Sequence, residues 1–210
     1  MFTSVPGIFG NQQNNYLDLI KQMLHQSLNP SEPYEVRFQA VKAIGAFIMT
    51  NDKETQILKH FSDLLLPTLT IVAESFNQQD DDTLLKLLID LAENVPKYLR
   101  PQLLPIFEMC MKLLSDQSTL DSWKQLALEA MITLSEMASA MVRKNAGKYV
   151  EQLVPIVLQM MADVDEDDTW GDQDEVLDED HDCNNVVAES ALDRLACGLG
   201  IFVVICTDVL

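Results

Sequence analysis

The sequence predicts an all-α fold, a right-handed α-solenoid built from helix pairs of the HEAT-repeat type. Apolar residues recur with helical spacing along most of the chain, and strand-like alternation is scarce. Several apolar stripes are wide enough to need neighbours on two sides, as in stacked layers of helices. A Leu-Pro or Val-Pro start recurs in three segments, LPTLTIV, LPIFEMC and VPIVLQM. Such internal repetition is typical of helical repeat proteins.

The predicted organisation is one repeat array with a segment at either end. Residues 1–13 are expected to be irregular, and residues 201–210 form a divergent apolar end. Between them, residues 14–200 should hold about four HEAT repeats. The expected repeat boundaries are 14–50, 53–95, 97–143 and 144–200.

Helix starts can be read from capping signals. Pro33 suits the first turn of a helix that runs to about Thr50. Asp82 is expected to be the N-cap of a helix whose apolar stripe follows it. Ser122 should open a further helix, with Gln125 in the position that a capping box requires. The predicted apolar face of this helix comprises Trp123, Leu126, Ala127, Ala130, Leu134, Met137, Ala138 and Met141. The methionines on it are expected to fill the core.

The spacing of equivalent core positions locates an insertion. These positions are Ile44, Leu91, Leu134 and Leu195, at intervals of 47, 43 and 61 residues. The first two intervals fit the period of about 40–47 residues of HEAT repeats, and the third is too long. The excess lies between the two helices of the last repeat, where residues 163–182 read DVDEDDTWGDQDEVLDEDHD. In a solenoid such insertions emerge on one face, often the binding face.

This acidic loop carries most of the charge of the chain. Twelve of its twenty residues are Asp or Glu and none is Lys or Arg, whereas the whole chain has 33 acidic and 14 basic residues. The net charge of −19 therefore falls to −7 outside the loop. A field of this sign repels nucleic acid and anionic lipid and attracts basic partners. Trp170 adds a ring that can contact the stem or the cation of Lys or Arg. The alternative is a merely solvated segment.

Other chemistry is poorly supported. The first aspartates of the loop have EF-hand spacing, but Asp168 stands where glycine is needed and Asp174 where glutamate is needed. His181 and Cys183 supply too few ligands for a tetrahedral metal site. We therefore predict no metal and no cofactor. No catalytic motif is present, and the sequence does not favour an enzyme.

Cysteine usage and hydropathy bear on the compartment. The four cysteines form no CxxC pair, and the start MFTSVPGIFG does not read as a secretory signal. A reducing intracellular compartment is expected. The longest apolar run, 195–206, is short of the roughly 20 residues of a membrane helix, so no membrane insertion is predicted.

Three runs carry a resemblance to a known family. NVPKYLRPQL at 94–103, QLALEAMITLSE at 125–136 and ESALDRLACGLG at 189–200, with the acidic Trp loop, resemble the importin-beta (karyopherin-beta) superfamily. The resemblance covers about residues 5–200. It implies a segment of a nuclear import receptor that binds basic cargo, such as histones and ribosomal proteins, and is regulated by GTP-bound Ran. It also implies contact with FG-repeat nucleoporins, and residence in cytoplasm and nucleus with transit through the pore of the nuclear envelope.

The same resemblance assigns the site residues. The family has an acidic run that ends in Trp, near cargo and Ran on the concave side, and the acidic loop matches it with Thr169 intervening. The candidate cargo- and Ran-binding residues are Asp165, Glu166, Asp167, Asp168, Trp170, Asp172, Asp174, Glu175, Asp178, Glu179 and Asp180.

Two departures keep other functions open. The chain resembles only an interior part of the N-terminal half of such a receptor, without its first repeats. The end IFVVICTDVL does not look like the continuation of the family. A HEAT-repeat scaffold and an acidic histone-chaperone-like binding module are the alternatives.

Overall fold

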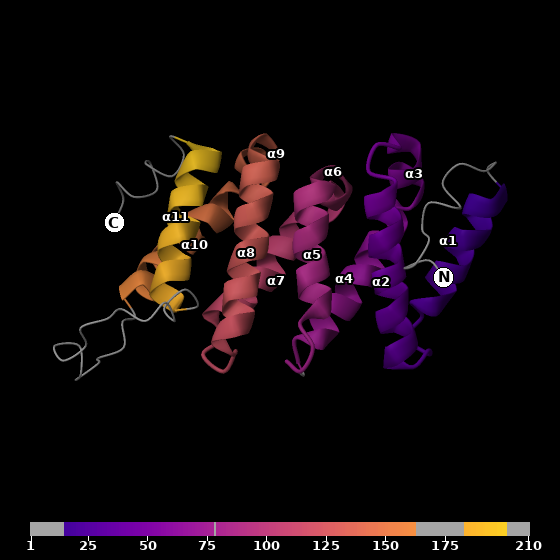
Figure 1. The fold of residues 1–210 in the computed structure, drawn as a ribbon, viewed down its shortest axis with the longest axis horizontal. Coiled ribbons are helices and arrows are strands. Elements are labelled where there is room, and N and C mark those ends of the chain that lie inside the picture. Colours follow the sequence, from indigo (N-terminus) through magenta and orange to yellow (C-terminus); the bar gives the residue numbers. More distant parts are fainter. Residues whose placement is uncertain (1–14, 78, 163–182, 201–210) are drawn as a thin grey trace, which may run out of the picture. The chain divides into compact units, whose positions relative to one another are not determined.

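The computed structural model describes residues 15–77, 79–162 and 183–200 (Figure 1). All regular structure in these three ranges is helical. The chain divides into two compact units, 1–109 and 110–210, and each is described by itself. The predicted irregular start at 1–13, the acidic loop and the apolar end lie outside the described residues.

The first unit consists of antiparallel helix pairs. Its helices are α1 (Asn15–Ser27), α2 (Tyr34–Thr50), α3 (Thr55–His60), η2 (Ser62–Leu64), α4 (Leu65–Ser75), α5 (Thr83–Asn94), α6 (Pro96–Leu99) and η3 (Arg100–Gln102). Helix α2 packs on α1, α4 and α5. Phe47 and Phe61 meet in the core with ring centroids 4.8 Å apart, and the Tyr98 hydroxyl donates a hydrogen bond to the Phe61 carbonyl at 3.1 Å.

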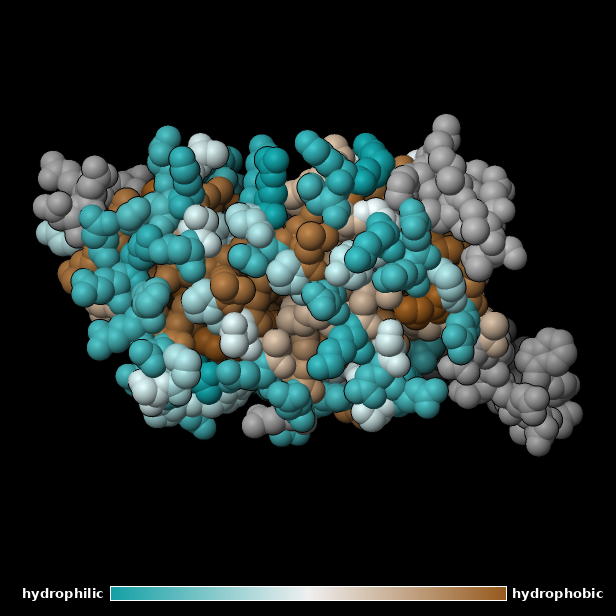
Figure 2. Space-filling view, turned by 180° about the vertical axis from the view of Figure 1, so that it is seen from behind, coloured by the Kyte–Doolittle hydropathy of each residue, from teal (hydrophilic) through white to brown (hydrophobic). Residues whose placement is uncertain are grey.

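The second unit repeats this plan. Helix α7 (Leu103–Ser115) leads into it, followed by α8 (Asp121–Met137), α9 (Ser139–Asn145), α10 (Gly147–Ala162) and α11 (Asn184–Leu199). Helix α11 packs on α8, α9 and α10. Trp123, Met131 and Val157 lie in the core of this unit. Figure 2 shows the face turned away in Figure 1, where apolar side chains emerge between polar ones.

The periodicity located the core correctly. Ile44, Leu91, Leu134 and Leu195 are each no more than 3% exposed. Helix α2 ends at Thr50, as predicted, with Pro33 at its N-cap position. Asp82 is at the N-cap position of α5, although its carboxylate does not cap the helix and instead pairs with Lys86 at 2.9 Å.

The start of α8 was predicted wrongly. The helix begins at Asp121, so Ser122 is inside it and Leu120 is at the N-cap position with no side-chain cap. The backbone amides of Trp123 and Lys124 bond to the Leu120 carbonyl instead. Gln125, expected in a capping box, donates its amide to the Asn184 side chain of α11 at 3.0 Å. A contact between helices has taken the place of the local one.

Two further expectations need correction. Met137 is 52% exposed and is not a core residue, because the buried run of α8 ends at Ser135, before the last turn. Pro155 does not start its helix, since α10 already begins at Gly147. Pro67 and Pro105, by contrast, are the third residues of α4 and α7, where a proline removes no intrahelical donor.

Candidate functional site

The eleven predicted site residues, from Asp165 to Asp180, all lie outside the described residues. The structure does describe the two helices to which their segment is joined. Helix α10 ends at Ala162 and α11 begins at Asn184, and the two helices pack against each other. The candidate site is therefore built from the described surface around these two helix ends.

A groove of about 590 Å³ lies at this place in the second unit. Ala162 and Asn184, which lie on either side of residues 163–182 (from here on the acidic segment), both line it. Its other lining residues include Asp116, Asp121, Lys124, Ile156 and Met160. The groove offers carboxylates beside apolar side chains, a combination that suits the charged end and the aliphatic stem of a lysine or arginine.

Local hydrogen bonds keep one of these carboxylates charged. The Ser118 hydroxyl and backbone amide donate to Asp116 at 2.7 and 2.9 Å. The Ser118 side chain, then its amide, lowers the pKa of Asp116 below the usual value for Asp. Asp121, in contrast, pairs with Lys124 at 3.3 Å. Asp116 is thus the groove carboxylate most available to a cationic ligand.

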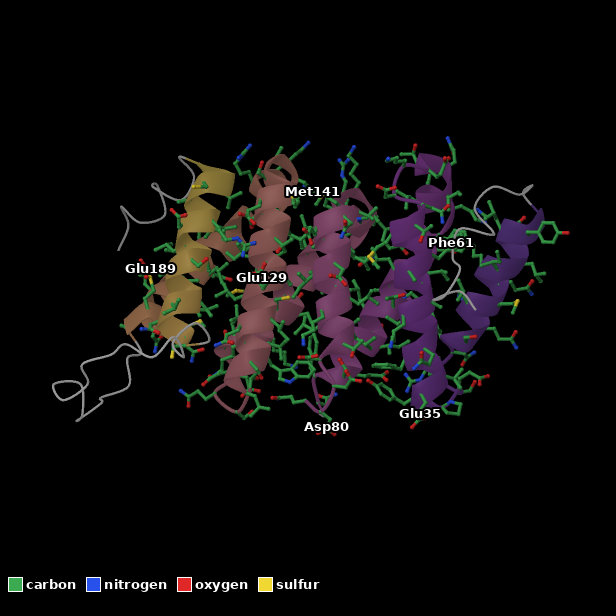
Figure 3. The ribbon with its side chains drawn as sticks, in the orientation of Figure 1. Glu35, Phe61, Asp80, Glu129, Met141 and Glu189 are labelled. Carbon is green, nitrogen blue, oxygen red and sulfur yellow. The ribbon has the colours of Figure 1, made fainter. Side chains whose placement is uncertain are left out.

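An arginine joins the two second helices of this unit, α8 and α11. Arg194 of α11 meets Glu129 and Glu136 of α8 at 2.6 Å each, and we call these three residues the Arg194 clamp. Hydrogen bonds to Glu136 and then to Glu129 raise the pKa of Arg194 further above its ordinary range. Figure 3 shows Glu129 on α8 and the exposed Glu189 on α11. Glu129 and Glu136 thus share one cation, whereas Glu189 is exposed to solvent.

A glycine brings the same helices close together. A Cβ atom on Gly198 would lie 3.1 Å from the Cα atom of Glu136 and 3.2 Å from the Ser135 carbonyl oxygen. Both contacts are with backbone atoms of a helix, which cannot move away as the end of a flexible side chain could. Together, Gly198 and the Arg194 clamp fix how α11 lies along α8, and hence where the acidic segment rejoins the fold.

The first unit has an acidic groove of its own, of about 360 Å³. It lies where the turn after α4 meets the start of α2, and Figure 3 shows Glu35 and Asp80 there. Tyr34 lines it, with the Arg37 guanidinium 5.7 Å from the ring centroid. Burial, and then the charge of Asp81, raise the pKa of Tyr34. This groove thus places carboxylates beside an aromatic ring, the same combination of side chains that the sequence has in the acidic loop around Trp170.

The turns at the other ends of the helices gather Lys and Arg, although the first of them also holds Asp52 and Glu54. We call 79–82 and 116–121 the acidic turns, and 51–60, 95–102 and 138–148 the basic turns. The basic turns hold seven of the 14 Lys and Arg residues, namely Lys53, Lys59, Lys97, Arg100, Arg143, Lys144 and Lys148. Within each unit, Figure 1 shows the two kinds of turn at opposite ends of the helices.

Sequence reasoning missed the clamp and the basic turns. The Arg194 clamp had one available signal, an arginine directly before the core position Leu195. For the basic turns the signal was the clustering of Lys and Arg in two short runs, PKYLR and VRKNAGK. The net charge of −19 drew attention to the acidic residues, and the clustering of Lys and Arg was overlooked.

No metal centre or membrane span emerges from the described residues. Within 15–77, 79–162 and 183–200, no three His, Cys, Asp or Glu side chains gather so that they could hold a metal ion. In the same ranges no helix is both long and apolar enough to cross a bilayer.

Comparison with protein families places the chain. Residues 1–109, more than half of the sequence, match a family model described as "IPO5-like, TPR repeats". The chain belongs to the importin-5-like family. Residues 116–205 match a second model, described as an importin repeat. This family lies within the importin-beta superfamily that the sequence resembles, and its members are transport receptors.

One curated relative and several solved structures extend this family match. A probable importin-5 homolog of Dictyostelium discoideum is 24% identical over 183 residues, which are 86% of this chain and 17% of the relative. The karyopherin Kap121p bound to the extreme C-terminus of the protein phosphatase Cdc14p superposes with a TM-score of 0.77 at 24% identity, over 98% of this chain and 20% of that one. Kap121p bound to RanGTP gives 0.61 at 17% identity, over 98% and 27%.

These comparisons confirm the predicted fold class of the importin-5-like chain. It is an all-α, right-handed solenoid of HEAT repeats. The intervals of 47 and 43 residues between core positions also fit HEAT repeats better than the period of about 34 residues of TPR repeats. The chain spans about a sixth of the curated relative and a fifth of the first solved neighbour.

Proposed function

We propose that this chain is a cargo-capturing segment of a nuclear import receptor, in which residues 163–182 bind basic segments of cargo and GTP-bound Ran regulates that binding. The observation that carries the proposal is the place of the acidic segment. It joins α10 to α11 beside a groove that already presents Asp116 and Asp121. The acidic segment is thus joined to the fold at helix ends that lie close to described carboxylates.

The family supports the proposed partners. Crystal structures of Kap121p have been determined with RanGTP and with the nucleoporin Nup53p. Because this chain is similar to Kap121p, we propose that it also contacts Ran and nucleoporins and that it shuttles between cytoplasm and nucleus. Basic cargo such as histones and ribosomal proteins fits the charge of the acidic segment.

Two physical effects would share the capture. The carboxylates act at a distance and steer a basic peptide toward the groove, an effect that salt screens. The ring of Trp170 acts only in contact, where a cation on an indole contributes about 0.5–2 kcal/mol. Steering changes the association rate, and the contact changes the dissociation rate.

Stopped-flow binding of a lysine-rich histone-tail peptide over a salt series tests the proposal. Neutralising Asp165, Glu166, Asp167 and Asp168 to Asn or Gln is expected to slow association about tenfold at low salt. Trp170→Ala is expected to speed dissociation by a few fold, with a weaker dependence on salt.

A matched control removes the same charge elsewhere. Asp52, Glu54, Asp90 and Glu93 are exposed residues of the first unit, and neutralising all four removes four charges from the unit that does not hold the proposed site. This control should slow association by less than about twofold. Equal effects of the two quadruple variants would contradict a dedicated site and reduce the acidic segment to one part of a diffuse negative field.

Ran separates the import reading from its alternatives. GTP-bound Ran is expected to release the peptide from a full-length receptor that contains this segment, and GDP-bound Ran is not. Peptide binding that ignores both forms of Ran would contradict the Ran-regulated part of the proposal. That outcome would favour a chaperone-like or scaffolding module.

A further inference from the structure

A groove in the first unit has the opposite character to the acidic site. It has a volume of about 600 Å³ and lies among the basic turns, between the segment around α3 and the end of α5 with α6. Apolar atoms of Leu58, Val95, Pro96, Tyr98 and Pro101 line it. The surface is concave and largely apolar, as peptide- and ligand-binding surfaces usually are.

The floor of this groove is held in place. Tyr98 is 3% exposed, and its hydroxyl donates to the carbonyl of Phe61 inside the core. Leu58 and Val95 are also buried, at 8% and 3% exposed. A partner would therefore find a surface that is already formed, and would lose little free energy in ordering it.

Three lysines stand at the rim. Lys53, Lys59 and Lys97 all line the groove and are exposed, whereas Asp52 is the one carboxylate among its lining residues. Nothing within the described residues forms an ion pair with any of these three lysines. They are thus free to meet carboxylates of a partner.

The surroundings make this charge unusual. The chain as a whole carries −19, yet this apolar groove has a rim of net positive charge. Long-range repulsion from the rest of the chain disfavours polyanions such as nucleic acid. A short peptide with an apolar side chain for the groove and carboxylates for the lysines satisfies both features.

We propose that this groove, between the α3 segment and α6, is a docking site for an acidic peptide with an apolar anchor residue. The anchor enters between Leu58, Val95 and Tyr98, and flanking carboxylates pair with Lys59 and Lys97. Such a ligand is opposite in charge to the basic cargo of the proposed function, so the two surfaces select different partners.

The test uses the whole chain and three labelled peptides in fluorescence anisotropy. The probe peptide has Trp and Leu four residues apart among glutamates. One control peptide has Gln in place of every Glu, and the other has Ala in place of Trp and Leu. We expect the probe to bind at least about tenfold tighter than either control, because it alone supplies both charge and anchor.

Variants assign the binding to the groove. Lys59→Gln with Lys97→Gln is expected to weaken probe binding about tenfold at low salt. The matched control, Lys112→Gln with Lys144→Gln, removes the same charge from exposed residues of the other unit and should change binding less than twofold. Thr55→Trp, at an exposed lining residue, fills the groove without changing charge and should weaken binding at every salt concentration.

Several outcomes would overturn the proposal. Equal losses in the two double-lysine variants would mean that the peptide senses only the total charge. Undiminished binding to Thr55→Trp, or to the peptide without its anchors, would mean that the groove is not used. Binding of anionic phosphatidylserine vesicles through the same lysines, with no binding of the probe peptide, would assign the surface to membranes instead.

Discussion

The acidic and basic turns sit at opposite ends of the same helices and hold their charges in different ways. In the acidic turns, side chains and amides two residues ahead fix the carboxylates, as Thr83 does for Asp81 and Ser118 for Asp116. In the basic turns of the first unit, the lysines are exposed and surround an apolar groove. One end of a helix pair therefore presents carboxylates held by hydrogen bonds, and the other presents lysine ammonium groups on long, exposed side chains.

The difference teaches that a repeat fold can separate charge by topology alone. Every turn from a first to a second helix emerges at one end of a pair, and every turn back emerges at the other. A chain with strong net charge can thus keep a small surface of the opposite sign. The total of −19 predicts solubility and long-range repulsion, but it does not predict which partner each end of a helix pair accepts.

The largest expected difference between the acidic site and the lysine-rimmed groove is in how salt affects peptide binding. Exposed charges more than about 8 Å apart are largely screened at physiological ionic strength. Raising NaCl from about 50 mM to about 500 mM should weaken binding of the basic peptide at least about tenfold. The acidic, apolar-anchored peptide should lose less affinity than the basic peptide, because the contribution of its anchor does not depend on charge. Isothermal titration calorimetry would measure both, and identical salt slopes would break the comparison.

The Arg194 clamp gives the next largest effect. Arg194→Met leaves Glu129 and Glu136 without their shared cation, and we expect a loss of about 1–2 kcal/mol in the unfolding free energy of the second unit. Hydrogen exchange should rise in α8 and α11 while the first unit stays protected. Lys124→Met, which removes an exposed ion pair, is the control and should cost less than about 0.5 kcal/mol. Similar losses in both variants would show that the clamp does not hold α11.

Two glycines allow a matched test of how closely the second helices pack. Gly198→Ala would press on the backbone of α8, so we expect a net loss of about 1 kcal/mol despite the better helix propensity of Ala. For Gly45→Ala the three nearest atoms to the new Cβ all belong to the side chain of Leu87, which is partly exposed and can move. Its cost should be offset by a propensity gain of about 0.5–1 kcal/mol. Chemical denaturation of both variants checks this, and a larger loss for Gly45→Ala would contradict it.

The smallest effect concerns the pKa of Asp116. Its folded pKa lies below its ordinary value, so its contribution to stability is present at neutral pH and is lost as pH falls through the folded pKa. Ser118→Ala removes the largest cause of that shift and should raise the pKa of Asp116 toward the ordinary value. Carboxyl NMR titration would detect it. Ser62→Ala, whose hydroxyl bonds to a carbonyl in the other kind of turn, should leave the pKa of Asp116 unchanged.

The sequence could predict features that depend on local spacing. Helical periodicity located the buried positions Ile44 and Leu195. The interval between core positions predicted extra residues in the last repeat, and the described helices α10 and α11 end at Ala162 and begin at Asn184. Both signals come from one chain segment at a time. Family resemblance supplied the same fold class as the structural comparisons.

What the sequence could not predict depends on partners far away in the chain. Arg194 meets Glu136 across 58 residues, and Gln125 meets Asn184 across 59, so a local capping rule misread Gln125. The lysine-rimmed groove likewise joins residues from 52 to 101. The spacing of hydrophobic residues predicts which face of a helix is buried. It does not predict which polar side chains of two neighbouring helices will contact each other.

Cross-linking of a bound basic peptide tests the central claim most directly. A carbodiimide joins lysines of a lysine-rich peptide to the carboxylates that they contact, and mass spectrometry identifies the joined residues. We predict that cross-links concentrate in residues 163–182 and at Asp116, and that they disappear at high salt. Cross-links that fall as often on Asp52 and Glu54, within a basic turn, and on Glu93 would contradict the claim that this chain captures basic segments at its acidic segment.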